Sequence, residues 1–229
     1  NGLNPNYNEL LGSSVSINAA GDRIAIGAPG PNSTWNNLNG YVQVYEYNGT
    51  SWVKLGANIY SGNPGDQFGF SVSMNDAGDR VAIGATKDGT SGTNSGSVTI
   101  FDFDGTNWNQ VGIKLNGSNV NNLFGHSVSL SSNGNILAVG APGNYGYVKI
   151  YNLVNNFWFQ LGSTLYAGNG GTYPCTTNES GFGNSVALND DGTKLVVGAP
   201  NTGIDYTFGQ CSSYGNDAGS VIYFSYGSV

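Results

Sequence analysis

Few residues in this chain could take part in covalent chemistry, and two of them are cysteines. Cys175 and Cys211 are the only thiols, and each lies in a long polar segment rich in Gly, Asn and Thr. Two buried free thiols fit poorly in such segments, whereas a disulfide suits them and indicates an oxidising compartment. A bridge closing these 36 residues (211 − 175) would contribute about 3–4 kcal/mol in the chain-entropy model.

The other side chains give little support for catalysis. His126 is the only histidine, and its counterparts in the repeats described below are Ser13, Phe70 and Asn184, which indicates a packing role. There is no nucleophile–base pair, phosphate-binding glycine loop or metal-spaced Cys/His cluster. Most acidic residues lie in predicted hairpin turns, where they satisfy the turn backbone. The sequence therefore predicts no enzymatic activity, metal or cofactor, with a glycosidase-like carboxylate pair as the alternative.

Charge and hydropathy limit the partners of the chain. Its 229 residues carry a net charge of −7, and the seven Lys and Arg residues are scattered singly. Nucleic acid is disfavoured as a partner because phosphate binding needs clustered cations. No run approaches 18 apolar residues, so we expect no membrane insertion. The chain opens at Asn1 without Met or an apolar leader, which fits a mature form or a fragment.

These residues are positioned by an internal repeat. Two glycine anchors recur in the same register, with steps of 57, 56 and 58 residues. The first anchor is Gly12, Gly69, Gly125 and Gly183; the second is Gly27, Gly84, Gly140 and Gly198. A period of this size marks a supersecondary unit that stacks on copies of itself. We predict one repeat domain, 1–229, with units at about 9–66, 67–122, 123–180 and 181–229, and with 1–8 as a linker or closing segment.

Each unit is predicted to form four antiparallel strands. In the second unit, FGFSVSMN alternates, DAGD turns, RVAIGA is a short apolar run, and SVTIFDF alternates again. A more polar fourth strand follows, NWNQVGIKL, beginning near Trp108. No stretch shows the period and caps of a helix. The fold class is therefore all-β, and four-stranded units of this kind are typical of β-propeller blades, with a sandwich or an open solenoid as the alternatives.

The repeated segments resemble a known family. FGFSVSMNDAGDRVAIGA, FGHSVSLSSNGNILAVGAP and FGNSVALNDDGTKLVVGAP are similar to FG-GAP repeats, the blades of the integrin α-chain head and of many secreted bacterial and algal proteins. The resemblance implies a β-propeller in an extracellular or cell-surface setting and does not imply a particular ligand. Integrin-type propellers have seven blades, whereas this chain has four units. The family's calcium loop is also missing, because hairpins such as NDAGDR are too short to supply the six or more oxygens that a hard cation needs.

Loops that differ between the units are the places where function can reside. The step from the second anchor to the glycine that opens strand three is 13, 12, 6 and 21 residues, and the connections between units are 13, 13 and 21. In a four-stranded blade both kinds of loop emerge on one face. The two longest carry Cys175 and Cys211, which supports the disulfide. On this face we expect a protein- or glycan-binding surface that includes Trp35, Tyr145, Tyr173, Tyr206, Phe208 and Tyr214, unless these rings pack the loops instead.

Four Asn-x-Ser/Thr sequons lie in predicted turns or loops: Asn32, Asn48, Asn116 and Asn178. Several sequons are expected by chance in a chain so rich in Asn, so their number carries little weight. If the source is eukaryotic, we expect at least one to carry a glycan. Asn48 should lie on the face opposite to the other three.

The leading functional hypothesis is a non-catalytic extracellular β-propeller that acts in adhesion or structural recognition at a cell surface or matrix. One alternative is a glycosylated subunit of an extracellular filament or coat, and a weaker one is a lectin-like module. The filament alternative comes from the fourth unit, which ends after VIYFSYGSV, its third strand. Either a longer protein has been truncated, or residues 1–8 or another copy of the chain pair beside residues 220–227 by strand addition.

Overall fold

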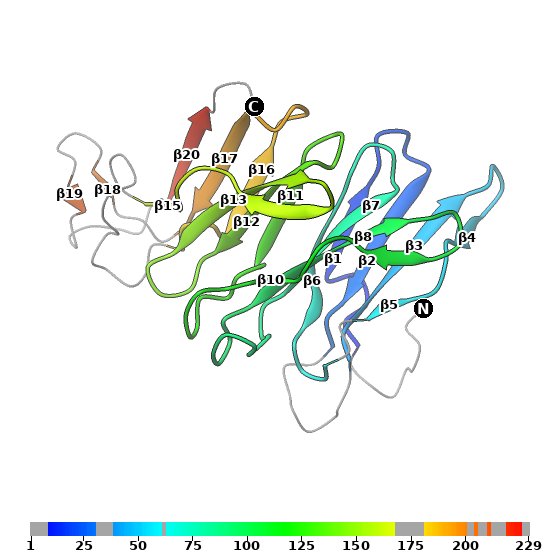
Figure 1. The fold of residues 1–229 in the computed structure, drawn as a ribbon, viewed down its shortest axis with the longest axis horizontal. Helices are drawn as coiled ribbons and strands as arrows, with labels where there is room; N and C mark the ends of the chain where they lie inside the picture. The colour runs from blue at the N-terminus through cyan, green and yellow to red at the C-terminus, as the bar shows by residue number, and fades with distance from the viewer. Residues whose placement is uncertain are drawn as a thin grey trace.

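The structure is a computed structural model that describes residues 9–30, 39–60, 63–167, 181–200 and 219–225, and the backbone at 204–205 and 210–211. This described part consists of β-strands and turns, with no helix, and so it has no helix that could cross a membrane. The predicted all-β fold class is confirmed. Figure 1 shows four sheets that follow one another in chain order.

Three of the sheets have the same order of five strands, and the fourth has three. The first sheet contains β1 (Ser14–Ile17), β2 (Arg23–Ala28), β3 (Tyr41–Tyr47), β4 (Trp52–Lys54) and β5 (Ile59–Tyr60). The second contains β6 (Phe68–Met74), β7 (Arg80–Ala85), β8 (Ser97–Phe103), β9 (Trp108–Gln110) and β10 (Leu115–Asn116). The third contains β11 (Ser127–Leu130), β12 (Ile136–Ala141), β13 (Tyr147–Val154), β14 (Phe157–Gln160) and β15 (Leu165–Tyr166). The fourth contains β16 (Ser185–Leu188), β17 (Lys194–Ala199) and β20 (Ser220–Ser225), while β18 (Ile204–Asp205) pairs with β19 (Gln210–Cys211).

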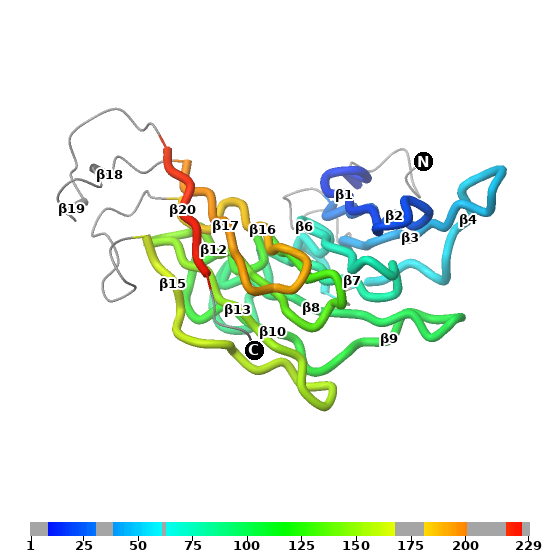
Figure 2. The backbone as a smooth tube through the Cα atoms, turned by 90° about the horizontal axis from the view of Figure 1, so that it is seen from above, coloured from blue at the N-terminus to red at the C-terminus, as the bar shows by residue number. Residues whose placement is uncertain are grey.

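Neighbouring strands are antiparallel throughout these sheets, and consecutive sheets fan out so that their inner strands lie near one another (Figure 2). The outer strands β4, β9 and β15 lie away from that centre. Among the described residues β20 pairs only with β17, at register Gly198↔Val221. Residues 1–8, predicted as one possible partner for β20, lie outside the described part of the chain.

The fourth strand differs from its prediction in one respect. The run NWNQVGIKL was expected to be continuous, but it forms two short strands, β9 and β10, which both pair with β8. Gly112 lies between them with a φ of +71°, a backbone conformation outside the extended region. Gly56 and Gly162 interrupt the outer strand of the first and third sheets in the same way, with φ of +75° and +70°.

The apolar core lies between the sheets. One cluster joins Val42 and Val44 of the first sheet to Val72, Met74 and neighbours of the second. Two further clusters fill the second–third and third–fourth junctions in the same manner. A phenylalanine at or just before the start of the inner strand is buried at each junction: Phe68, Phe124 and Phe182. Each sheet therefore depends on its neighbours for burial, as the repeat period predicts.

Glycine is required where consecutive sheets touch. A Cβ on Gly84 would lie 2.0 Å from the carbonyl oxygen of Gly125 in the next sheet, and Gly27 and Gly140 have the same relation to Gly69 and Gly183. These distances are far below any real carbon–oxygen contact, so a side chain would force the sheets apart. This anchor therefore allows close packing at the three junctions. Among the described residues Gly198 has no such neighbour, since its Cβ would approach only Ser185 of its own sheet.

Hydrogen bonds reinforce the same junctions. The hydroxyl of Ser71 donates to the carbonyl of Gly125 (2.7 Å), and Ser14 and Ser127 make the equivalent bonds at the other two junctions. At the hairpin end of the sheets, the backbone N–H of Asp76 donates to the carbonyl of Ser132 (3.0 Å). Because these groups are desolvated as the sheets meet, each pairing fixes the register of one sheet on the next.

Candidate functional site

Three loops meet at the end of the second and third sheets where the third strands begin. They are 86–96, 117–123 and 142–146, and they belong to both kinds of variable loop identified in the sequence. Asn144 donates a side-chain hydrogen bond to the carbonyl of Val120 (2.7 Å), and the amide group of Asn94 donates to the side-chain oxygen of Asn121 (2.9 Å). The two kinds of loop therefore share one face of the molecule here, as predicted.

A cavity of about 410 Å³ opens between two of these loops and the third sheet. The loop between β10 and β11 provides one wall, and β13 with the segment near β15 provides the other. The described residues that line it are Ser118, Asn119, Asn122, Tyr145, Gly146, Tyr147, Lys149, Thr164 and Tyr166. We call this the tyrosine cavity. It contains the one predicted ligand-face residue that the structure describes, Tyr145.

The floor of the tyrosine cavity is rigidly held. The ring of Tyr147 is buried and lies 6.3 Å, centroid to centroid, from Tyr166. The ammonium of Lys149 lies 5.5 Å from the centroid of the Tyr147 ring and donates to the hydroxyl of Ser118 (2.9 Å). Burial lowers the pKa of Lys149 and raises the pKa of Tyr147. These contacts fix one cation and two aromatic rings in place before any ligand arrives.

The chemistry of this lining suits a hydroxyl-rich or amide-rich ligand. Tyr145 leaves 46% of its surface exposed, and the side-chain amides of Asn119 and Asn122 add donors and acceptors. Aromatic faces pack against the apolar face of a sugar or a peptide while amides and a cation orient its polar groups. The described lining residues include no carboxylate, histidine or thiol.

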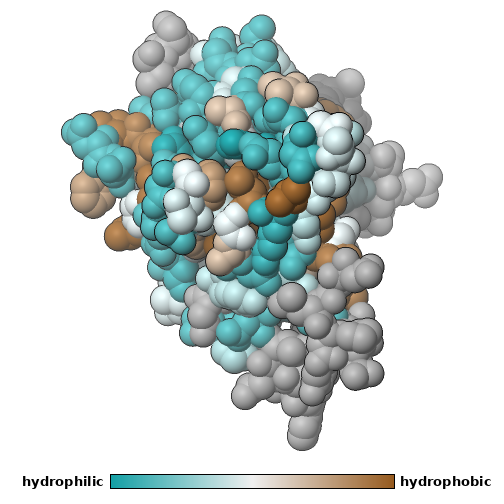
Figure 3. All heavy atoms as spheres, turned by 90° about the vertical axis from the view of Figure 1, so that its right-hand side faces the viewer, coloured by the Kyte–Doolittle hydropathy of each residue, from teal (hydrophilic) through white to brown (hydrophobic). Residues whose placement is uncertain are grey.

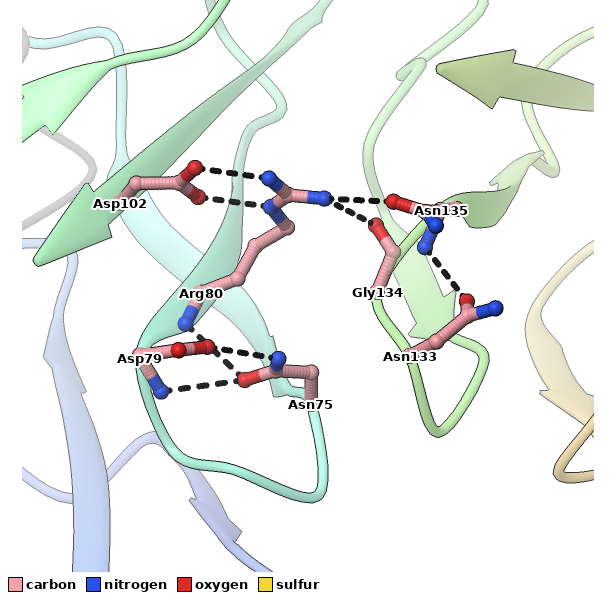
Figure 4. Close-up of polar contacts among 7 residues, drawn as sticks. All are labelled: Asn75, Asp79, Arg80, Asp102, Asn133, Gly134 and Asn135. Atoms are coloured by element: carbon pink, nitrogen blue, oxygen red, sulfur yellow. Dashed lines mark hydrogen bonds and ion pairs between the residues drawn. The ribbon is translucent and has the colours of Figure 1, made fainter. Parts of the chain in front are cut away.

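A second cavity, of about 310 Å³, lies at the opposite, hairpin end of the same two sheets. Figure 4 shows its central residue, Arg80, which makes two hydrogen bonds to the carboxylate of Asp102 (2.6 and 2.7 Å). It also donates to the carbonyl of Gly134 and the side-chain oxygen of Asn135 in the next sheet, both at 3.0 Å. The donors of Arg80 are occupied by the protein itself, so we interpret this cavity as a structural tie across the junction.

The hairpin beside Arg80 is also satisfied internally. The side-chain oxygen of Asn75 accepts hydrogen bonds from the backbone N–H groups of Asp79 (3.1 Å) and Arg80 (2.9 Å), and its amide donates to the carboxylate of Asp79 (2.8 Å) (Figure 4). These are the polar residues that the sequence placed in turns. Among the described residues no three His, Cys, Asp or Glu side chains come together as metal ligands would.

A buried acidic residue strengthens the long loop of the second sheet. Asp88 pairs with Lys114 (2.5 Å) and accepts hydrogen bonds from the hydroxyls of Thr90 (2.5 Å) and Ser97 (2.7 Å). Burial would raise the pKa of Asp88, but these hydrogen bonds outweigh it and lower the pKa to about 2. Burial and the nearby charge of Asp88 raise the pKa of Asp66. The Asp88–Lys114 ion pair therefore stabilises this loop, and neither residue lines the tyrosine cavity.

His126 lies between sheets rather than in a cavity. Its ring centroid is 4.9 Å from that of Phe70, and its Nδ1 lies 3.2 Å from the carbonyl of Asn184. Burial lowers its pKa. Two of its counterparts in the other repeats, Phe70 and Asn184, are thus its neighbours, and these contacts are those of a packing residue.

Two of the predicted glycosylation sites are described, and both are exposed. Asn48 lies in the turn between β3 and β4, where its side-chain oxygen accepts hydrogen bonds from the N–H groups of Thr50 and Ser51, both at 3.0 Å. Asn116 was expected in a turn or loop, but it is the second residue of β10, paired with Ser97. This pairing puts it at the loop end of its sheet, whereas Asn48 follows the far end of β3.

Most of the other predicted site residues lie outside the described part of the chain. They are Cys175, Asn32, Asn178, Trp35, Tyr173, Tyr206, Phe208 and Tyr214. The backbone of Cys211 pairs with Ile204 in the small β18–β19 sheet, and its side chain is not described. The disulfide and these binding and glycosylation sites therefore stay predictions.

The sequence analysis missed the rest of the tyrosine cavity. One signal could have found it. Lys149 occupies a strand position that holds Gln43, Thr99 and Ile222 in the other sheets, which makes it the only cation there. A single lysine between the apolar residues Val148 and Ile150 indicates a position in the third sheet whose side chain does more than pack in the apolar core.

The rim of the first two sheets exposes both apolar and polar side chains. Figure 3 views the right-hand side of Figure 1, and its apolar side chains lie in separate patches among polar ones. Tyr47 and Trp52 of the first sheet pair with ring centroids 5.4 Å apart, and both are partly exposed.

Comparison with known proteins identifies the fold. Structurally, the chain is similar to a candidate 6-phosphogluconolactonase from Bacteroides uniformis, with a TM-score of 0.58, 13% identity, and coverage of 94% of this chain and 53% of that one. It is also similar to the β-propeller domain of Cps50 (Swd1) from Myceliophteria thermophila, with a TM-score of 0.50, 11% identity, and coverage of 81% and 49%. The chain therefore spans about half the length of these structures. The identities are low enough that the likeness concerns the fold alone.

No curated protein matches the chain. Residues 55–101, from the end of the first outer strand through most of β8, match the FG-GAP repeat family. This match covers the Phe68–Gly69 motif and the Gly84–Ala85 motif. Gly69 packs against Gly27 of the first sheet, and Gly84 packs against Gly125 at the start of the third. Residues 55–101 thus form an FG-GAP repeat, and the consecutive antiparallel sheets of the chain have the fold of a β-propeller.

Proposed function

We propose that this protein is a non-catalytic recognition module that binds a saccharide at a cell surface or in an extracellular matrix, in the manner of an adhesion protein. The observation that carries the proposal is the tyrosine cavity, which combines the exposed ring of Tyr145, the fixed rings of Tyr147 and Tyr166, and the ammonium of Lys149.

The composition of the cavity supports binding rather than turnover. Catalysis of acyl or glycosyl transfer needs a nucleophile, or a pair of carboxylates, close to the reacting atoms. The described residues that line the cavity offer amides, hydroxyls and one ammonium instead. The buried acid of the neighbouring loop, Asp88, is already paired with Lys114.

An extracellular setting is supported by the FG-GAP repeat, a repeat found in surface and secreted proteins, by the predicted bridge between Cys175 and Cys211, and by the sequons. The two described sequons are compatible with a glycan, since Asn48 and Asn116 are exposed. A glycan on Asn116 would stand close to the cavity, because Ser118 of the same sequon lines it.

Binding to a printed glycan array, followed by titration with the best oligosaccharide, tests this function. Tyr145→Ala should weaken binding about tenfold or more, because truncating a central aromatic residue removes more than 1.4 kcal/mol from an interface. Tyr60→Ala is the matched control, because Tyr60 is equally exposed (46%) but lies in the first sheet, away from the cavity. Equal binding by both variants, or binding to no glycan on the array, would overturn the proposed function.

A further inference from the structure

The outer face of the fourth sheet exposes side chains that are buried in the other three sheets. Val221 is 73% exposed and Tyr223 is 58% exposed. Val221 lies opposite Gly198 in the strand register, just as Val98 lies opposite Gly84, and Val98 is fully buried. We call the set Val196, Val221 and Tyr223 the tail face.

The inner strand of the first sheet exposes the complementary positions. Val15 is 69% exposed, whereas its counterpart Val72 in the second sheet is 9% exposed and packs on the first sheet. Ile17 is exposed in the same way, while Met74 is buried. We call Val15 and Ile17 the head face. At each of the three internal junctions, the residues equivalent to the tail face pack on the residues equivalent to the head face of the next sheet. The internal junctions therefore show that a head face is the surface that fits a tail face.

The polar groups of a junction are also present at both ends. Ser185 is exposed and keeps the hydroxyl that Ser14, Ser71 and Ser127 donate to the next sheet. At the hairpin end, Ala19, Asp76 and Ser132 each donate a backbone N–H to the carbonyl of the equivalent residue in the next sheet, the last of them to Asp190 (2.9 Å), and Asp190 is the next member of this series.

We propose that two copies of this chain associate head to tail, with the head face of one copy docked on the tail face of the other. This contact repeats the internal junction. Ser185 would donate to the carbonyl of Gly12 of the partner subunit, and the N–H of Asp190 would donate to the carbonyl of Ala19 of the partner subunit. The surface is heterologous, so a first contact leaves one head and one tail free for further copies.

Differences in side-chain size at the two ends compensate one another. Tyr223 replaces Val44, Ile100 or Ile150, and is larger than each. Leu11 replaces the buried Phe68, Phe124 or Phe182 and is smaller. Phe68 and Val44 lie in one apolar cluster, so the extra volume of Tyr223 falls where Leu11 leaves room. Ala187 has no hydroxyl, whereas Ser16, Ser73 and Ser129 accept an N–H from the next sheet, which makes this contact weaker than the internal ones.

Sedimentation velocity of the full chain over a range of concentrations tests the proposal. The wild-type chain should form dimers and larger species as its concentration rises. Val221→Asp on the tail face and Val15→Asp on the head face should each abolish this association, because each buries a charge at the contact. Val53→Asp, at a half-exposed rim position of β4, makes the same change in charge and should leave association intact.

Mixing the two blocked variants distinguishes head-to-tail contact from any other. Val15→Asp retains an intact tail and Val221→Asp an intact head, so an equimolar mixture should form dimers and nothing larger. Should one variant fail to fold by circular dichroism, Ile17→Asp or Tyr223→Asp replaces it. A wild-type chain that is monomeric at every concentration overturns the proposal and leaves these faces to a repeat outside the 229 residues. Association that survives Val221→Asp or Val15→Asp, or a mixture that stays monomeric, overturns it as well.

Discussion

The junction between the second and third sheets and the outer face of the fourth sheet share the glycine and serine of the repeated motifs, but only the junction has a described sheet beyond it. Gly84 and Gly198, Ser71 and Ser185, occupy equivalent positions. In the junction, the carbonyl of Gly125 lies against both Gly84 and Ser71; the fourth sheet presents the same groups without a described neighbour. The glycine of the repeated Gly-Ala motif is therefore required by the adjacent sheet and not by the sheet that contains it.

The largest expected difference is between Gly84→Ala and Gly198→Ala. A methyl group on Gly84 would collide with the backbone of the next sheet, at a cost of about 3 kcal/mol in the free energy of unfolding. On Gly198 it would meet only the hydroxyl of Ser185, which can rotate, so a loss below about 1 kcal/mol is expected. Urea unfolding of both variants at a concentration where the chain is monomeric provides the measurement. Equal losses would mean that the sheet itself needs this glycine.

Arg80 and Lys194 form the next pair, since each begins the second strand of its sheet. Arg80→Ala removes the paired hydrogen bonds to Asp102 and leaves the carbonyl of Gly134 without its donor, which should cost about 2 kcal/mol. Lys194→Ala should change the unfolding free energy by less than about 0.5 kcal/mol, because Lys194 is exposed. In the third sheet, Ile136 packs on Gly192 instead, so Arg80→Ile should recover part of the loss. An Arg80→Ala variant as stable as Lys194→Ala would contradict the structural interpretation of the hairpin cavity.

Removing a single junction hydroxyl should have a smaller effect. Ser71→Ala deletes the hydrogen bond to Gly125 and leaves a carbonyl oxygen less well satisfied, which should cost about 1 kcal/mol. Ser185→Ala should leave the thermal midpoint of the monomer unchanged, because Ser185 has no sheet beyond it among the described residues. Differential scanning calorimetry of the two variants would detect the contrast, and a destabilised Ser185→Ala monomer would argue against it.

The smallest expected effect is a pH dependence of the free energy of unfolding that comes from Asp88, in loop 86–96 of the second sheet. The folded pKa of Asp88, about 2, lies below the usual aspartate value of 3.8, so its contribution to stability is present above about pH 4 and is lost as the pH falls towards 2. The raised pKa of Asp66 has the opposite sign and offsets part of this loss. Asp88→Asn should therefore flatten the acid limb of stability against pH, whereas Asp191→Asn, in the exposed hairpin of the fourth sheet, should do so less. Identical acid limbs for wild type and Asp88→Asn would contradict this assignment.

The fold could be predicted from the sequence because each junction is encoded by residues at a fixed period. Gly27, Gly84 and Gly140 mark that period in the sequence, and the structure places each of them at a contact between sheets. The outer strand was predicted less well, because Gly112 turns the backbone between two segments that both carry strand-forming residues.

The tyrosine cavity could be predicted only in part, for a related reason. Its walls come from two different units, Ser118 and Asn122 from the connection out of the second and Tyr145 to Tyr166 from the third. A comparison of repeats position by position identifies Tyr145 as a loop residue but does not show that Asn122 will face it. Their proximity depends on how one sheet is rotated against the next, and the sequence of a single repeat does not determine that rotation.

Placing the core between sheets also has an evolutionary consequence. Because each sheet contributes one half of two junctions, duplicating a whole 57-residue unit between existing ones would add a sheet and a junction together and leave every other contact as it was. Gain or loss of a partial unit would instead leave the glycine of a Phe-Gly motif without the Gly-Ala glycine that it contacts in the preceding sheet. Genes for such chains can therefore change length readily in whole repeats.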